Sequence, residues 1–306
     1  MRIFKDLNFD FMGKRKTFYM VSAVILLGGV LSLLFKGVEF GLDFKGGTEV
    51  VVRFPRALEI NELRKWMNEA DMGSIEIKSF GSDTDYIVRT DQKGEGTTIS
   101  TRIKDVLLEH FPKEGIEILQ ENIVEAKIGS EIRRDAVIAI FFALIGILIY
   151  IGFRFKIIFA IGAVVALFHD VLLTLGIVSM FTNLIPGLNL EFDQAMVAAF
   201  LTLVGFSVND TVVVFDRVRE NLKLSKSSAF EPVLNKSINT TMSRTVLTSM
   251  STFLVMVALA FFGGEPTRGF AFTMALGVIT GTYSSIFVAS ALTLDWTISR
   301  KAKITF

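Results

Sequence analysis

Six long apolar stretches constrain this chain more than any other feature of its sequence. They run from Thr17 to Phe35, Ala136 to Phe153, Ile157 to Phe181, Ala195 to Phe215, Thr245 to Phe262 and Gly269 to Leu294. An α-helix of about 17 to 25 such residues crosses the hydrocarbon core of a membrane, and it satisfies its own backbone hydrogen bonds there. Hydrophobic residues make up 51% of the 306-residue chain, which is too apolar for an ordinary soluble fold. The sequence therefore predicts a membrane protein, an α-helical bundle of six transmembrane helices.

Basic residues predict how the helices are oriented, because short loops rich in Lys and Arg stay on the cytoplasmic side. Such residues occur in the N-terminal segment, after the second and fourth helices and in the C-terminal tail, which all fall on one side. The short loops on the other side contain only Arg268. We therefore expect residues 1–16 and 299–306 to be cytoplasmic. The sequence Phe35-Lys36-Gly37 is not a small-x-small cleavage site, so we expect the first helix, residues 17–35, to be retained. Topology accounts for the basic residues, and we expect no nucleic-acid partner.

Residues 36–135 separate the first two helices and have a soluble composition, so we expect them to form one extracytoplasmic domain. Residues 48–54, 74–80, 85–90 and 115–126 have strand character, and helical spacing of apolar residues begins near Leu58 and again near Thr97. The order β-α-β-β-α-β predicts an α+β ferredoxin-like domain, a fold that implies no function by itself. Residues 136–298 then hold the second to sixth transmembrane helices.

The stretch GLDFKGGTEV joins the first helix to this domain and contains Asp43, Gly46 and Gly47. A Gly-Gly pair permits a tight turn, or it can cradle an anion with backbone amides. The P-loop spacing is absent, and the sequence favours a structural turn. The chain has no cysteine, and neither GxSxG, HExxH nor a Walker motif occurs. We expect no cofactor, no metal site and no enzymatic activity.

Charged residues inside membrane helices are rare and indicate functional sites. The third helix contains His169 and Asp170 near mid-depth, and the fourth contains Asn209 and Asp210. Arg244 precedes the fifth helix, which is expected to lie beside the fourth. An arginine that approaches and leaves Asp210 would favour and then disfavour its ionised form, so the pair forms a plausible proton-controlled switch.

The same polar residues also have structural interpretations. Asn209 and Asp210 are also suited to joining helices by hydrogen bonds, and Arg244 to reaching lipid phosphate at the interface. For His169 and Asp170 a packed, hydrogen-bonded pair is favoured over a metal or relay site. Small residues in the sixth helix, including Gly277 and Gly281, indicate close helix packing.

Several motifs together resemble the SecF family, whose members are the smaller partners of SecD in bacterial protein export and relatives of the resistance-nodulation-division (RND) exporters. The matching stretches are FDFMGKRK, GLDFKGGT, FHD, VGFSVNDTVVVFDRVREN, SRTVLTS and RGFAFTMALGVITGTYSSIF. The resemblance implies an RND-like half in the bacterial inner membrane, and it implies that Asp210 and Arg244 serve proton transport.

The same resemblance implies a function and partners. The function is to couple the proton-motive force to outward movement of an exported polypeptide during Sec-dependent translocation. The partners are a SecD-like subunit, the Sec channel with its accessory subunits, the exported polypeptide and protons. A stand-alone RND-type exporter of small molecules and a purely structural scaffold for the SecD-like subunit are the alternatives.

Overall fold

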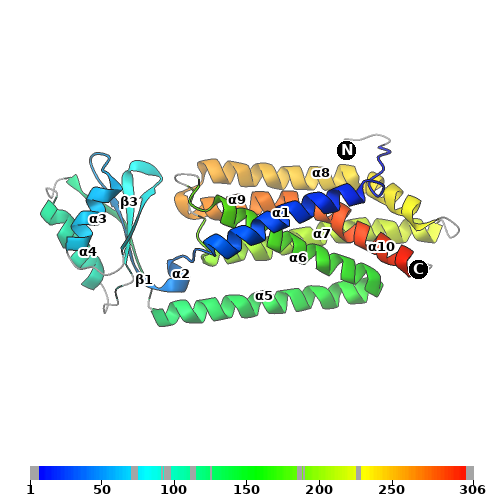
Figure 1. Ribbon diagram of the computed structural model, residues 1–306, viewed down its shortest axis with the longest axis horizontal. Helices are drawn as coiled ribbons and strands as arrows, with labels where there is room; N and C mark the ends of the chain where they lie inside the picture. Colours follow the sequence, from blue (N-terminus) through cyan, green and yellow to red (C-terminus); the bar gives the residue numbers. More distant parts are fainter. Residues whose placement is uncertain are drawn as a thin grey trace.

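The computed structural model of the chain describes residues 7–69, 75–90, 92, 98–110, 115–124, 126–184, 188, 190–224 and 229–300. Residues 1–6 and 301–306 of the predicted termini, and residues 70–74, 93–97 and 111–114 of the predicted outer domain, lie outside the described residues. A small α+β domain and a bundle of long helices follow one another along the long axis (Figure 1). The beginning of α1 (Arg15–Lys36) and the end of α10 (Ala291–Ser299) both lie at the end of the bundle remote from the sheet.

The prediction of six membrane helices is confirmed: the described residues contain six helices long and apolar enough to cross a membrane. They are α1, α5 (Ala126–Arg154), α6 (Ile157–Phe181), α7 (Gln194–Leu224), α8 (Phe230–Phe262) and a last crossing built from α9 (Glu265–Ser284), the π-helix η2 (Ser285–Ser290) and α10. Such a π-helical segment inside an α-helix is rare and often lies at a functional site.

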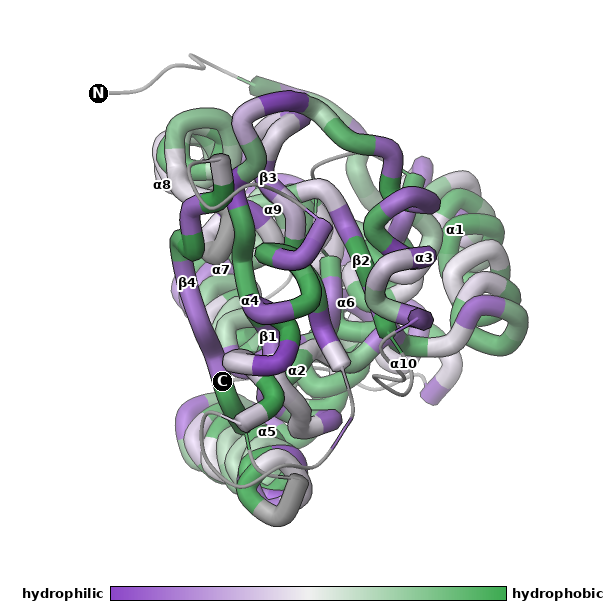
Figure 2. Tube along the Cα trace, turned by 90° about the vertical axis from the view of Figure 1, so that its left-hand side faces the viewer, coloured by the Kyte–Doolittle hydropathy of each residue, from purple (hydrophilic) through white to green (hydrophobic). Residues whose placement is uncertain are grey.

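The six crossings form an inner and an outer group. More than half of the apolar part of α6, α7 and the last crossing is buried, against 11% or less for α1, α5 and α8. Seen from the sheet end, α1, α5 and α8 lie at the periphery, and α5 stands furthest from the other helices (Figure 2). The inner helices therefore carry most of the core, including Phe159, Leu203 and Met274.

Several helices extend beyond the apolar stretches that predicted them. Helix α5 begins at Ala126 rather than Ala136, α7 continues past Phe215 to Leu224, and α8 begins at Phe230 rather than Thr245. Hydropathy locates the part of a helix that lies in lipid, whereas packing decides where the helix ends. Leu222 of α7 and Leu234 of α8 are buried in the same core beyond the predicted span, so the two helices continue as a pair.

The domain near the sheet end has the predicted ferredoxin-like order, which is confirmed. Its elements are β1 (Gly47–Arg53), α3 (Ile60–Glu69), β2 (Ile75–Phe80), β3 (Ser82–Thr90), α4 (Thr98–His110) and β4 (Glu117–Val124). The antiparallel sheet has the order β2-β3-β1-β4, so β3 lies between the two strands that α3 connects. Val50 and Val88 pack on one sheet face with Leu63 of α3 and Ile103 of α4. Because side chains alternate along a strand, the other face is free to meet the helix bundle.

Candidate functional site: polar clusters in the membrane and at the domain junction

Asp170 is the centre of a buried polar cluster among the inner helices. Its side chain has no exposed surface. Ser207 of α7 and Ser284 of α9 donate hydrogen bonds to Asp170 Oδ2 over 2.5 and 2.6 Å. Both distances lie at the short end of the usual range for O–H···O hydrogen bonds. A single carboxylate of α6 therefore ties α7 and α9 together.

His169 extends this cluster to α1. Its Nδ1 lies 3.0 Å from Asp170 Oδ1, and its Nε2 lies 3.0 Å from Ser22 Oγ. Ser22 Oγ in turn lies 2.8 Å from the hydroxyl of Tyr283. Both ring nitrogens of the imidazole thus have a partner within the protein, and the histidine joins an outer helix to the inner group.

Asp210 lies on the same helix as Ser207, one turn further along α7, and it is held much more loosely. Only 3% of the residue is exposed. The hydroxyls of Ser249 in α8 and Thr282 in α9 lie 3.4 and 3.5 Å from Asp210 Oδ2, and they lie 2.6 Å from each other. Hydrogen bonds from hydroxyls are usually 2.5 to 3.0 Å long, so this carboxylate has only marginal contacts.

The structure does not join Arg244 to Asp210 by an ion pair. Arg244 is exposed on α8, and within the described part of the chain no hydrogen bond or ion pair of its side chain is found. Asn209 is also exposed, on the side of α7 away from the core. Asp210 instead faces inward, towards α8 and α9. The proposed role of the Asp210 and Arg244 pair stays a prediction.

The hydroxyl partners of both carboxylates were not identified from the sequence. Thr282 and Ser284 lie in a stretch whose small residues predict close packing, and packing is close there: a Cβ on Gly281 would lie 3.0 Å from Ser207 Cβ. The same stretch also supplies hydrogen bonds to Asp170 and Asp210. The sequence shows Thr282 and Ser284 as hydroxyl groups in a membrane helix. It does not show that they contact Asp210 and Asp170, because these carboxylates lie on other helices.

The predicted turn around Asp43, Gly46 and Gly47 connects the sheet domain to the membrane helices. It contains a short helix, α2 (Leu42–Lys45), followed by two glycines with positive φ. A Cβ on Gly47 would lie 2.5 Å from the carbonyl oxygen of Thr90, so only glycine fits there. Asp43 Oδ2 accepts a hydrogen bond of 3.1 Å from the backbone N–H of Gln194, the first residue of α7. The turn therefore contacts the helix that carries Asp210.

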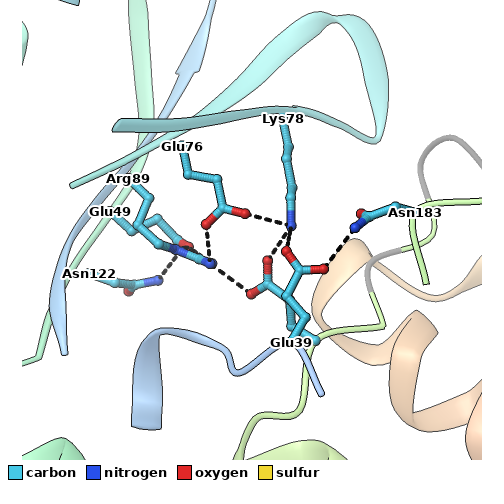
Figure 3. A network of polar contacts seen from close by, with 8 residues as sticks. Glu39, Glu49, Glu76, Lys78, Arg89, Asn122 and Asn183 are labelled. Atoms are coloured by element: carbon cyan, nitrogen blue, oxygen red, sulfur yellow. Dashed lines mark hydrogen bonds and ion pairs between the residues drawn. The ribbon is translucent and has the colours of Figure 1, made fainter. Parts of the chain in front are cut away.

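A second polar cluster lies between the sheet and the helix bundle (Figure 3). Strand register places Glu76, Arg89, Glu49 and Asn122 in one row across the four strands. Arg89 Nη2 lies 2.6 Å from Glu49 Oε2, and Arg89 Nη1 lies 2.8 Å from an oxygen of Glu191, which precedes α7. The row on the sheet is thus joined directly to the membrane part.

Lys78 makes a second connection of the same kind. Its ammonium lies 2.9 Å from Glu39, 2.9 Å from Glu76 and 2.7 Å from Glu191. Burial disfavours the charged lysine, but the neighbouring carboxylates, Glu191 first, outweigh burial and raise the pKa of Lys78. The three carboxylates lie close enough to hold a cation, and Lys78 provides the positive charge among them.

Comparison with known proteins agrees with this architecture. The family described as "Protein export membrane protein SecD/SecF, C-terminal" matches residues 103–299, and the "SecD/SecF GG Motif" matches residues 31–54. The protein translocase subunit SecF of Rhodothermus marinus is 44% identical over 96% of this chain and 95% of its own length. The SecF subunit of Calditerrivibrio nitroreducens is 39% identical over 94% of this chain and 93% of its own.

Two solved structures share the fold. The crystal structure of SecDF, a translocon-associated membrane protein from Thermus thermophilus, is 34% identical with a TM-score of 0.84, and the match covers 96% of this chain. SecDF in a super-membrane-facing form gives a TM-score of 0.69 at 35% identity over 97% of this chain. The chain spans only 39 and 40% of the length of those two SecDF chains. The chain belongs to the SecF branch of the SecD/SecF family of protein-export membrane proteins.

Proposed function

We propose that this chain is one half of a proton-driven SecDF-type complex that assists Sec-dependent protein translocation across the bacterial inner membrane. The curated relatives of nearly the same length are translocase subunits named SecF. The chain matches only a part of each longer SecDF chain. A SecD-like subunit would supply the remaining part.

The observation that carries the proton step is the state of Asp210. It is a buried carboxylate in a transmembrane helix, its two hydroxyl contacts are long, and no cation touches it among the described residues. A carboxylate at such a site is costly to keep ionised. Binding and release of a proton there would change which neighbours the side chain attracts, and α7 would respond. One proton crossing 100 mV provides about 2.3 kcal/mol for such a movement.

The exposed polar side chains beside Asp210 support a partner in the membrane. Asn209 on α7 and Arg244 on α8 are exposed at or near the level of the bilayer. Charged side chains in a membrane normally face protein or water rather than lipid. A SecD-like subunit that covers this face would bring its own groups close to Arg244 and would place the arginine between itself and Asp210.

The orientation follows from the charge of the two ends. The sheet domain would lie on the outer side of the membrane, and both termini would lie in the cytoplasm, because Lys and Arg concentrate at the end of the bundle remote from the sheet. The Sec channel and the emerging polypeptide would then meet the complex from the side of the sheet domain, where movement of α7 reaches the sheet through Asp43 and Glu191.

The test measures translocation by the chain together with a SecD-like subunit in proteoliposomes. Asp210→Asn and Arg244→Ala are each expected to abolish the stimulation of translocation by a proton gradient, together with the accompanying proton flux. Asp216→Asn is the matched control, since it makes the same carboxylate-to-amide change six residues further along α7. Asp216 is partly exposed and paired with Arg154 over 3.0 Å, so its loss should leave stimulation unchanged.

Three results would contradict parts of this proposal. Full stimulation in both variants would remove Asp210 and Arg244 from the proton path and leave a scaffold role. Proton-coupled transport of small molecules by the chain alone would favour a stand-alone exporter. Failure of the chain to copurify with a SecD-like subunit in mild detergent would exclude the two-subunit arrangement.

A further inference from the structure

An apolar cavity of about 280 Å³ lies among α5, α6 and α7, in the part of the bundle nearer the sheet. Helix α5 contributes Ile140, Ala143 and Leu144, and every other residue that lines the cavity is Leu, Phe or Val. Among the described residues no polar side chain lines it, so it offers no partners for water. Phe168 and Leu172 of α6 border the cavity and are about half exposed, which opens it towards the surrounding membrane.

The cavity is the place where α5 fails to pack closely on the inner helices. Only 6% of the apolar part of α5 is buried, the smallest share among the six crossings. Figures 1 and 2 both show α5 set apart from its neighbours. Packed helices lie 8 to 10 Å apart, with a diameter of about 10 Å each, so a cavity of this size admits a flexible chain and not a further helix.

A cation stands above the cavity on the same face of α5. Arg133 precedes Ile140 by seven residues and Leu144 by eleven, spacings that place each of the two within about 20° of Arg133 around the helix. The seven-residue step is about 10 Å along the axis. Arg133 lies just before the apolar stretch that begins at Ala136, so a membrane that surrounds this stretch would bring its headgroups close to the arginine.

The surroundings of Arg133 leave its charge available. Its side chain is exposed, and among the described residues its guanidinium has no hydrogen bond or ion pair. Glu131 and Asp135, the nearest carboxylates along α5, lie on the opposite side of the helix because two residues correspond to about 200°. Among the described residues, Arg133 therefore provides a positive charge with no carboxylate partner on the cavity face of α5.

We propose that this site binds a phospholipid of net negative charge, with one acyl chain in the cavity and its phosphate at Arg133. The cavity takes the chain because it is apolar, open to the membrane and too narrow for a helix. The arginine selects the headgroup, since a basic residue near the membrane surface attracts anionic lipids. The bound lipid fills the space between α5 and the inner helices. This inference does not depend on proton coupling.

The test places a single fluorescent reporter in the full chain. Trp66 and Trp296, the two native tryptophans, are replaced by Phe, and either Ile140→Trp or Phe142→Trp is added. Ile140 lines the cavity, whereas Phe142 is 65% exposed on the opposite face of α5. The proteins are placed in nanodiscs of phosphatidylcholine with a small share of phosphatidylglycerol. Bromine atoms, which quench tryptophan, are carried on the acyl chains of one lipid or the other.

The Ile140→Trp reporter is expected to be quenched about fivefold more strongly, per mole of lipid, by brominated phosphatidylglycerol than by brominated phosphatidylcholine. The Phe142→Trp reporter should show no preference. Arg133→Gln should remove the preference at Ile140→Trp, and Arg134→Gln, the same change one residue further on a different face, should retain it. Ala143→Phe, which fills the cavity, should reduce quenching at Ile140→Trp by both lipids.

Equal quenching of the Ile140→Trp reporter by the two lipids, or an unchanged preference in Arg133→Gln, would overturn the proposal. So would an Ile140→Trp reporter that neither lipid quenches, because the cavity would then be closed. The measurement is repeated with a SecD-like subunit bound. Loss of quenching on binding would show that the partner, and not a lipid, covers the cavity.

Discussion

The junction and the membrane interior each bury a group of carboxylates, and they neutralise them in different ways. At the junction, Lys78 and Arg89 lie among four glutamates at ion-pair distances. In the membrane, Asp170 and Asp210 are contacted by hydroxyls and one imidazole, and no lysine or arginine touches either one among the described residues. Ion pairs between opposite charges hold the junction cluster together. The contacts of the membrane carboxylates depend instead on how closely the helices pack against one another.

The two membrane carboxylates differ from each other as well. Asp170 receives two short hydroxyl bonds and one contact from His169, while Asp210 has two hydroxyls near the limit of hydrogen bonding. Helix α7 contributes to the junction and to both membrane carboxylate sites. The backbone N–H of its first residue donates to Asp43, and the helix carries both Ser207, which donates to Asp170, and Asp210 itself. The helix is therefore held firmly at the junction and at Asp170, and loosely at Asp210.

The largest effect should come from breaking the junction. Arg89→Met leaves Glu49 without its cation and leaves Glu191 with Lys78 alone, and loss of one partner of a buried ion pair typically costs roughly 3–5 kcal/mol. We expect hydrogen exchange to show this loss in the opening free energy of β1 and β3. Arg53→Met is the matched control in the same sheet, and its effect should be much smaller because Arg53 pairs with Asp85 while remaining half exposed. Equal losses of opening free energy in the two variants would mean that the buried ion pairs of Arg89 contribute no more to stability than the half-exposed pair of Arg53.

Asp170→Leu should have the second largest effect. The substitution keeps the branched shape and the number of side-chain heavy atoms and removes three contacts, each worth about 0.6 kcal/mol in a membrane protein, so we expect a loss of roughly 2 kcal/mol. The free energy of unfolding, measured by denaturant titration in lipid bicelles, tests this value. A loss below that of the Asp210→Leu variant would contradict the assignment of Asp170 as the firmly held carboxylate.

The fold was largely predictable from the sequence because the signals for it are local. Hydropathy identified six helices, and strand alternation identified β1 and the other strands within a few residues. Helices α7 and α8 continue beyond the predicted apolar stretches, where Leu222 and Leu234 are buried by tertiary packing. No local pattern carries that information.

The site was predictable only in part, for a related reason. His169, Asp170, Asn209 and Asp210 are conspicuous because ionisable and amide groups are costly in lipid. Their partners Ser22, Ser207 and Ser249 are ordinary residues of other helices. The junction cluster brings Glu39, Lys78 and Glu191 together from three distant segments. The short ion-pair distances follow from strand register and domain packing, which a single sequence does not display.

Asp210→Leu should destabilise the protein less than Asp170→Leu does. Its two hydrogen bonds of 3.4 and 3.5 Å are weak, and Ser249 and Thr282 retain each other as partners, so the loss of stability should be less than about 1 kcal/mol. The bicelle titration used for Asp170→Leu measures it. Together with loss of proton-stimulated translocation in Asp210→Asn, a small change would separate function from folding at this residue. A loss as large as that of Asp170→Leu would instead make Asp210 a structural centre.

The smallest effect concerns pH at the junction. Burial disfavours the ionised form of Glu76, but the hydrogen bond from Lys78 and the charges of Lys78 and Arg89 outweigh burial and hold the pKa of Glu76 below its ordinary value of 4.5. A carboxylate with a lowered pKa stabilises the folded state fully above its unfolded pKa and loses this contribution as the pH falls through the folded value. The opening free energy of β2 and β3, compared between the wild type and Glu76→Gln, should therefore differ by a constant amount above about pH 5.5 and converge below pH 4.5. Burial raises the pKa of Asp193, but that group is present in both proteins and its contribution cancels in the difference. A difference that stays constant down to pH 3 would show that the contribution of Glu76 to the junction comes from packing and not from its charge.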